Sequence, residues 1–153
     1  MNKFDNDMSF GLNKEDLVLN YLNNTEYLKN PLEKSLKKTA PFDYYNDTTF
    51  IELKSRRNTY LKYPTTMVGD NKLKIAEEDT TKKYFFYFYF TDGLYKWAYN
   101  SEQYELKEGG RRDRGRPEIK LYGYIPIVNL IFVSKDLKIE KEVSTESESE
   151  SES

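Results

Sequence analysis

Residues 41–57 read PFDYYNDTTFIELKSRR and combine a β-hairpin pattern with a group of charged residues. Asn46 and Asp47 are typical turn residues. The segments on either side of them, 42–45 and 48–53, are rich in aromatic and β-branched residues, as strands usually are. The pattern predicts two antiparallel strands joined by a turn centred on Asn46 and Asp47.

The predicted hairpin brings two acidic side chains and one lysine to a single face. A tight turn at this position places Asp43 opposite Phe50, and side chains alternate between the two faces of a strand, so Asp43, Glu52 and Lys54 share a face. Asp43 and Glu52 would be diagonal neighbours about 7–8 Å apart, close enough for both carboxylates to bind one divalent cation. A register shift of one residue would turn Glu52 and Lys54 away from Asp43.

The chain contains no cysteine and no histidine. Disulfides, thiolate metal sites, catalytic triads and histidine general bases are therefore excluded. A metal ion would have to bind oxygen ligands, which favours magnesium, manganese or calcium.

Charge is unevenly distributed along the 153 residues. Residues 1–139 carry 23 basic and 20 acidic side chains, a net charge of +3, whereas residues 140–153 hold six glutamates and one lysine. We expect a single domain over 1–139 and a disordered acidic Ser/Glu tail over 140–153. The sequence has no secretory signal and no membrane-spanning run, so we expect an intracellular protein that does not enter membranes.

A glycine-rich segment, GGRRDRGRP, concentrates positive charge in the second half of the chain. It predicts either a solvated loop or a contact with a polyanion. Its four arginines, candidates for binding nucleic acid, are Arg111, Arg112, Arg114 and Arg116.

Two helices are predicted on either side of the hairpin. The first runs from Asn13 to about Lys29 and places Glu15 on its apolar stripe, although a glutamate in the first turn also simply complements the helix dipole. The second runs from about Asp70 to Lys83 and carries Lys72 and Lys74.

Further strands are expected beyond the second helix, whereas 58–66 looks like a loop. The segment YFFYFYF is apolar on both faces, as a central strand would be. Residues 127–133 are apolar and fit either a helix or a strand. The expected strands are 84–90, its antiparallel return 94–100, then 103–107 and 118–125.

This order of elements, with an aspartate on one strand and acid-x-lysine on the next, resembles the PD-(D/E)XK (restriction-endonuclease-like) nuclease superfamily over residues 13–100. The acid-x-lysine triplet occurs five times in the chain, but only Glu52–Lys54 follows a strand bearing an aspartate. The resemblance implies an α+β fold with an α-β-β-α-β core, in which a mixed central sheet of five to six strands is flanked by helices.

The resemblance also implies a metal-dependent endonuclease that hydrolyses phosphodiester bonds in DNA, with branched or structured DNA among the candidate substrates. Mg²⁺ or Mn²⁺ would be held by Asp43, Glu52, the Leu53 backbone carbonyl and Glu15, while Lys54 would orient the attacking water. Arg56, Arg57, Lys72 and Lys74 would contact the nucleic acid. Enzymes of this type that cut both strands usually act as homodimers.

Two other interpretations of the same residues stay open. Asp43 and Lys54 could form an ordinary cross-strand ion pair worth less than about 1 kcal/mol, with no metal site. Alternatively, a nuclease-like fold without catalysis could bind nucleic acid through its 14 tyrosines, nine phenylalanines and the arginine segment. Convergence of Asp43, Glu52 and Lys54 in a cleft with Glu15 would favour the catalytic interpretation, whereas a binding module needs only a basic face.

Overall fold

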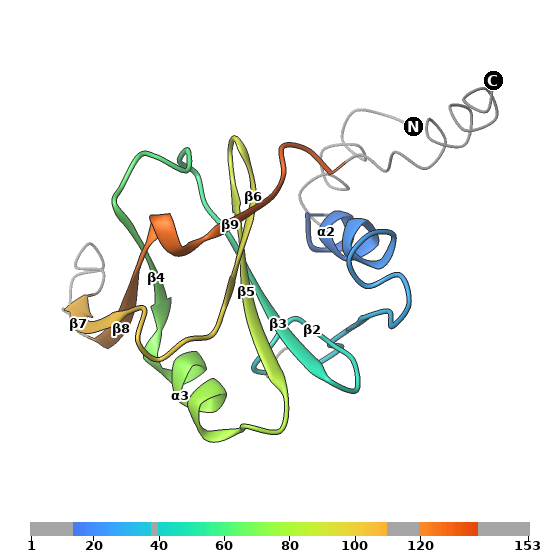
Figure 1. Cartoon of the computed structure of the whole chain (residues 1–153), viewed down its shortest axis with the longest axis horizontal. Helices are drawn as coiled ribbons and strands as arrows, with labels where there is room; N and C mark the ends of the chain where they lie inside the picture. Colours follow the sequence, from blue (N-terminus) through green and yellow to red (C-terminus); the bar gives the residue numbers. More distant parts are fainter. Residues whose placement is uncertain (1–13, 38–39, 110–119, 138–153) are drawn as a thin grey trace. The chain divides into compact units, whose positions relative to one another are not determined.

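The computed structural model describes residues 14–37, 40–109 and 120–137 (Figure 1). The chain divides into two compact units, one comprising residues 1–32 and 136–153 and the other comprising residues 33–135. Each unit is described by itself. The predicted acidic tail, 140–153, lies outside the described residues, and the single domain over 1–139 stays a prediction.

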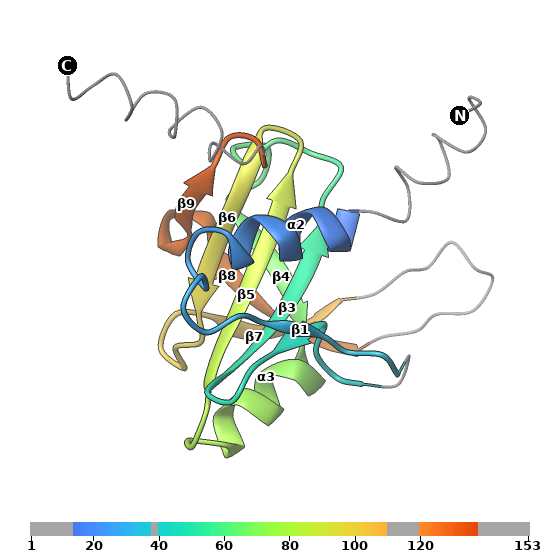
Figure 2. The ribbon, with the colours of Figure 1, turned by 90° about the vertical axis from the view of Figure 1, so that its right-hand side faces the viewer.

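The larger unit is built on a mixed six-stranded sheet with the strand order β1-β2-β3-β5-β6-β9. β3 and β5 are parallel, and every other pair of neighbours is antiparallel. Figure 2 shows β3, β5, β6 and β9 side by side. The strands are β1 (Glu33–Lys34), β2 (Tyr44–Tyr45), β3 (Thr49–Ser55), β5 (Lys83–Phe90), β6 (Gly93–Ala98) and β9 (Ile131–Ser134).

A second, three-stranded antiparallel sheet has the order β4-β8-β7 (Figure 1). Its strands are β4 (Thr65–Gly69), β7 (Glu105–Gly109) and β8 (Lys120–Pro126). The assignment of residues 58–66 to a loop is wrong at its end, because β4 begins at Thr65. This strand has only five residues and gains its hydrogen bonds from β8, more than fifty residues later, so no local pattern marks it.

The core of this unit lies where the two sheets and α3 (Asp70–Glu78) meet. β5 contributes alternate aromatic side chains, β4 and β8 contribute Val68 and Ile125, and α3 contributes Leu73 and Ala76. The aromatic members from β5 and β6 are Tyr84, Phe86, Phe88, Phe90 and Trp97. The expected α+β class, mixed central sheet and central apolar strand are confirmed.

Both predicted helices end earlier than their sequence patterns suggested. α2 (Lys14–Asn23) ends where the Asn23 side chain donates to the Leu32 carbonyl at 3.0 Å and accepts from its N–H at 2.8 Å. α3 ends at Glu78, because the next residue, Asp79, accepts a hydrogen bond from the Thr81 N–H. Such side-chain bonds compete with the helical backbone pattern.

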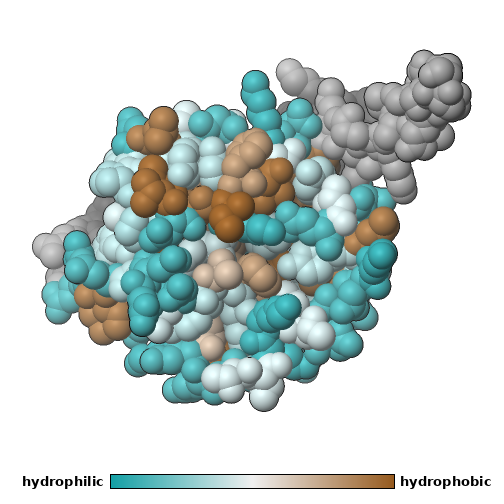
Figure 3. Space-filling view, viewed as in Figure 1, coloured by the Kyte–Doolittle hydropathy of each residue, from teal (hydrophilic) through white to brown (hydrophobic). Residues whose placement is uncertain are grey.

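The ambiguous segment 127–133 forms a short 3-10 helix, η1 (Ile127–Asn129), and then β9. Figure 3 shows hydrophobic side chains in separate patches among hydrophilic ones, several of them over η1 and β9. Val128, Ile131 and Phe132 are exposed there. Within the described residues, no helix is both long enough and apolar enough to cross a membrane.

Candidate active site

The hairpin has a wider loop than predicted. Tyr45 pairs with Phe50 and Tyr44 pairs with Ile51, so the predicted pairing of Asp43 with Phe50 is wrong by two residues. The Asn46 side-chain oxygen accepts the N–H groups of Thr48 and Thr49, each at 2.9 Å, and this closes a four-residue loop. Because a shift of two preserves the alternation of side chains, Glu52 and Lys54 keep the face predicted for them.

Asp43 ends the regular pairing of the hairpin. Its N–H donates to the Ile51 carbonyl at 3.0 Å, and its Oδ2 accepts the N–H of Leu53 at 2.8 Å. The carboxylate is therefore fixed to the backbone between Glu52 and Lys54.

Glu52 is a buried carboxylate between two lysines. Its side chain is 8 % exposed, with Oε2 3.2 Å from Lys54 Nζ and Oε1 3.6 Å from Lys72 Nζ. Burial raises the pKa of Glu52 above its usual value, and the charge of Asp43 raises that pKa further, whereas the two lysines lower it. The structure thus brings Asp43, Glu52 and Lys54 together, as the hairpin pattern predicted.

Lys72 reaches this group from the first turns of α3. Besides its ion pair with Glu52, its ammonium donates to the Pro41 carbonyl and lies 5.3 Å from the centre of the Phe42 ring. The sequence predicts Lys72 only as a phosphate contact, because no local pattern shows that its ammonium reaches Glu52 on β3.

Residues 32–130 match the sequence family described as "Phage putative PDDEXK endonuclease". The match covers more than half of the chain and includes Asp43, Glu52, Lys54 and Lys72. The chain belongs to this PD-(D/E)XK family. No curated protein matches the chain.

Other lysines and arginines predicted to bind nucleic acid in this PD-(D/E)XK protein differ in their surroundings. Arg56 is turned inward: its Nε donates to Thr66 Oγ1 at 3.1 Å and its Nη2 donates to the Met67 carbonyl at 2.5 Å. Burial lowers the pKa of Arg56. Arg57 is exposed, and Lys74 is an exposed partner of Asp70 at 3.4 Å. Phosphate contacts by these residues stay predictions, and Arg56 has a structural role that the sequence did not reveal.

Two further sets of predicted site residues in the PD-(D/E)XK protein, Glu15 and the arginine segment, are not placed relative to the hairpin. Glu15 lies in the first turn of α2, which belongs to the other unit. The arginine segment lies outside the described residues and contains Arg111, Arg112, Arg114 and Arg116. Their roles stay predictions.

The donor set at the hairpin fits a divalent cation that prefers oxygen. Asp43 and Glu52 supply carboxylates, and their charges are close enough for Asp43 to raise the pKa of Glu52. A cation between them would remove this repulsion. Within the described parts of the chain, no three acidic side chains gather into one metal-binding group.

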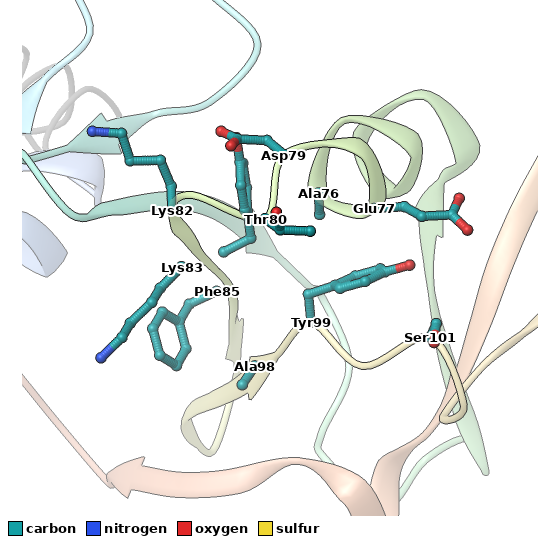
Figure 4. A pocket seen from close by; sticks show the side chains of 11 residues that line it. Ala76, Glu77, Asp79, Thr80, Lys82, Lys83, Phe85, Ala98, Tyr99 and Ser101 are labelled. Atoms are coloured by element: carbon teal, nitrogen blue, oxygen red, sulfur yellow. The ribbon is translucent and has the colours of Figure 1, made fainter.

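A cavity of about 520 Å³ lies elsewhere in the PD-(D/E)XK fold, between the end of α3, the start of β5 and the end of β6. Figure 4 shows its two acidic side chains, Glu77 and Asp79, pointing in different directions. Asp79 instead accepts a hydrogen bond from the Tyr84 hydroxyl at 2.7 Å. The convergent acids are those of the hairpin and not those of this cavity.

Proposed function

We propose that this protein is a metal-dependent endonuclease that hydrolyses phosphodiester bonds in DNA. The observation that carries the proposal is the buried Glu52 carboxylate, which lies beside Asp43 and between Lys54 and Lys72, in a chain of the PD-(D/E)XK family. An ordinary cross-strand ion pair does not account for it, because Lys54 pairs with Glu52 and a second lysine shares the same carboxylate.

Asp43 and Glu52 would hold Mg²⁺ or Mn²⁺, with the Leu53 carbonyl and Glu15 as additional ligands inferred from the family resemblance. Nucleases of this superfamily generally use divalent metal ions. A bound Mg²⁺ or Mn²⁺ would supply Lewis-acid chemistry, polarising a phosphate oxygen and lowering the pKa of water. The Leu53 N–H holds the Asp43 carboxylate in place through a 2.8 Å hydrogen bond, so little reorganisation is needed when the carboxylate is used.

Lys54 and Lys72 have different proposed roles because their side chains differ in exposure to solvent. The Lys54 side chain is 33 % exposed and can approach a phosphate or a water molecule while it stays near Glu52. The Lys72 side chain is 18 % exposed and is also bound to Pro41, so it orients Glu52 from the protein side. In this proposal Lys54 touches the substrate and Lys72 is a positioning residue.

The test is a cleavage assay with the purified chain and labelled plasmid, flap, four-way-junction, single-stranded DNA and RNA substrates. We expect cleavage of DNA in Mg²⁺ or Mn²⁺, none in EDTA, and binding without cleavage in Ca²⁺. Glu52→Gln, Asp43→Asn and Lys54→Ala should each lower the rate by at least about 100-fold. Glu102→Gln, which changes an exposed glutamate in the turn before β7, is the matched control and should cleave like the wild type.

Cleavage in EDTA, or full activity of Glu52→Gln, would contradict this mechanism. Binding of nucleic acid without cleavage of any substrate in Mg²⁺ or Mn²⁺ would instead favour the non-catalytic binding module. In that case the same three substitutions should leave affinity unchanged.

A further inference from the structure

A second cavity, of about 360 Å³, opens where the chain passes from β3 to β4. We call it the tyrosine cavity. It combines aromatic rings with a cationic side chain, and the lining residues that matter here are Arg56, Tyr60, Tyr63, Met67, Phe90 and Tyr124.

The inner wall of the tyrosine cavity is already held in place. The Tyr60 ring stacks on Tyr95 with 4.0 Å between ring centroids and 3° between planes, and its hydroxyl donates to the Ile127 carbonyl at 2.7 Å. The Tyr60 N–H donates to Asp92 Oδ1 at 2.9 Å. A planar ligand that stacks inside would therefore lose little affinity to ordering of this wall.

The outer wall is open to solvent, and lysines lie beside two of its tyrosine rings. Tyr63 is 54 % exposed and Met67 is 38 % exposed. Lys62 lies 5.9 Å from the Tyr63 ring centre, and Lys107 lies 5.4 Å from the Tyr124 ring centre. Glu105 is the acidic neighbour of Lys107, at 3.7 Å. Exposed rings beside cations are suited to bases joined by phosphates.

The aromatic surface continues along β8 from Tyr124 to Tyr122, which shares its face because the two residues are two positions apart. Gly109, on neighbouring β7, makes room for both rings: a Cβ there would lie 2.5 Å from the Tyr124 hydroxyl and 3.1 Å from Tyr122 Cδ2. Both rings thus lie over the β7 backbone. Tyr122 also lines another cavity together with Lys120 and Asn71.

Arg56 joins this surface to the candidate active site. It follows Lys54 by two residues and binds Thr66 and Met67 of β4 through its guanidinium. A nucleic-acid strand with one phosphate at Lys54 would therefore reach the tyrosine cavity after passing Arg56.

We propose that the tyrosine cavity, with Tyr122 beside it, binds unpaired bases of a single-stranded nucleic acid by stacking. The inference rests on the proposed function and narrows its substrate to nucleic acid with a single-stranded stretch next to the scissile phosphate. Stacking on tyrosine accepts every base, so the site contributes affinity without reading sequence.

The experiment measures fluorescence anisotropy of labelled oligothymidylate, oligouridylate and a blunt DNA duplex in EDTA, with the full-length chain. We expect tighter binding of a single strand than of the duplex. Comparing the affinities for oligothymidylate and oligouridylate shows whether the preferred single strand is DNA or RNA. Tyr63→Ala and Tyr124→Ala should each weaken single-strand binding by about 5- to 150-fold. Tyr63→Phe and Tyr124→Phe should bind like the wild type, because the ring is retained.

Ile131→Ala is the control, since Ile131 is 57 % exposed and lies on β9, and the affinity of this variant should equal that of the wild type. Thermal denaturation identifies any variant that fails to fold, and Tyr63, which lies outside the strands, provides the test if Tyr124→Ala does not fold. Equal affinity for single strand and duplex, or wild-type affinity of Tyr63→Ala, would overturn the proposal. EDTA removes metal ions, so the binding measurement does not depend on catalysis. A protein that prefers single strands in this assay but cleaves no substrate in Mg²⁺ or Mn²⁺ contradicts only the nuclease function.

Discussion

Glu52 is the residue on which the candidate site depends. A glutamate this buried is stable as an anion only when cations compensate for its missing hydration, and here Lys54 and Lys72 each approach one carboxylate oxygen. The arrangement leaves the carboxylate fixed in orientation before any ligand binds.

Lys72 and Lys74 offer a matched comparison on one helix. Lys72→Ala should lower the free energy of unfolding by about 1–3 kcal/mol, because the buried Glu52 and the Pro41 carbonyl are each deprived of a charged partner. Lys74→Ala should change it by no more than about 0.5 kcal/mol, because the pair with Asp70 is exposed. Urea denaturation measures both values, and equal effects would contradict the positioning role of Lys72.

At the scale of elements, the β2–β3 loop sets the position of Glu52 relative to Asp43. Asn46 holds this loop by accepting two backbone N–H groups. Asn46→Ala should therefore lower the free energy of unfolding by about 1 kcal/mol, and Asn46→Asp, which retains the acceptor oxygen, should lower it less. The measurement is urea denaturation of the three proteins. An alanine variant as stable as the wild type would show that the strands alone fix the register.

The turn between α3 and β5 gives a dependence on pH. Hydrogen bonds from the Thr81 hydroxyl, the Tyr84 hydroxyl and the Thr81 N–H hold the pKa of Asp79 below its usual value. A lowered carboxyl pKa stabilises the fold above the unfolded pKa, and this stability disappears as pH falls through the folded pKa. Asp79→Asn should therefore be less stable than the wild type at pH 7, with the difference shrinking as the pH falls below about 4.

Urea denaturation across this pH range checks the prediction for Asp79. Asp47→Asn, which changes an exposed aspartate in the hairpin loop, is the comparison. A difference between wild type and Asp79→Asn that stays constant with pH would show that the carboxylate charge is not involved.

At the scale of the whole molecule, the sequence separates a chain of +3 over residues 1–139 from six glutamates after it. Four arginines of the positive part lie between β7 and β8. We expect them to bind phosphates without reading bases, through the two-point geometry of the guanidinium group.

Replacing these four arginines with alanine should flatten the dependence of log affinity on log salt by about 0.7–0.9 for each phosphate that the protein no longer neutralises. Sequence preference should not change. Titrations at several salt concentrations measure the slope, in the full-length chain and in a chain truncated after Lys138. An unchanged slope in both proteins would mean that the arginines do not bind nucleic acid. The replaced residues are Arg111, Arg112, Arg114 and Arg116.

The sequence by itself determined the features that depend on local alternation and on residue types. The two-residue period of β3 placed Glu52 and Lys54 on one face. The predicted pairing of β2 with β3 was shifted by two residues, and an even shift leaves each side chain on its predicted face. The apolar run that became β5 had to be covered on both faces, and Tyr84, Phe86, Tyr87, Phe88 and Phe90 are buried. The lack of cysteine and histidine limited any metal ligands to oxygen.

Only the tertiary structure decided which distant segments meet. Lys72 on α3 pairs with Glu52 on β3, β4 is a strand because β8 pairs with it, and Arg56 binds two residues of β4. A local pattern records which way a side chain faces but not which partner it will find. The partner depends on how the whole core packs. Tertiary packing buries Glu52 of the hairpin and brings two lysines to its carboxylate.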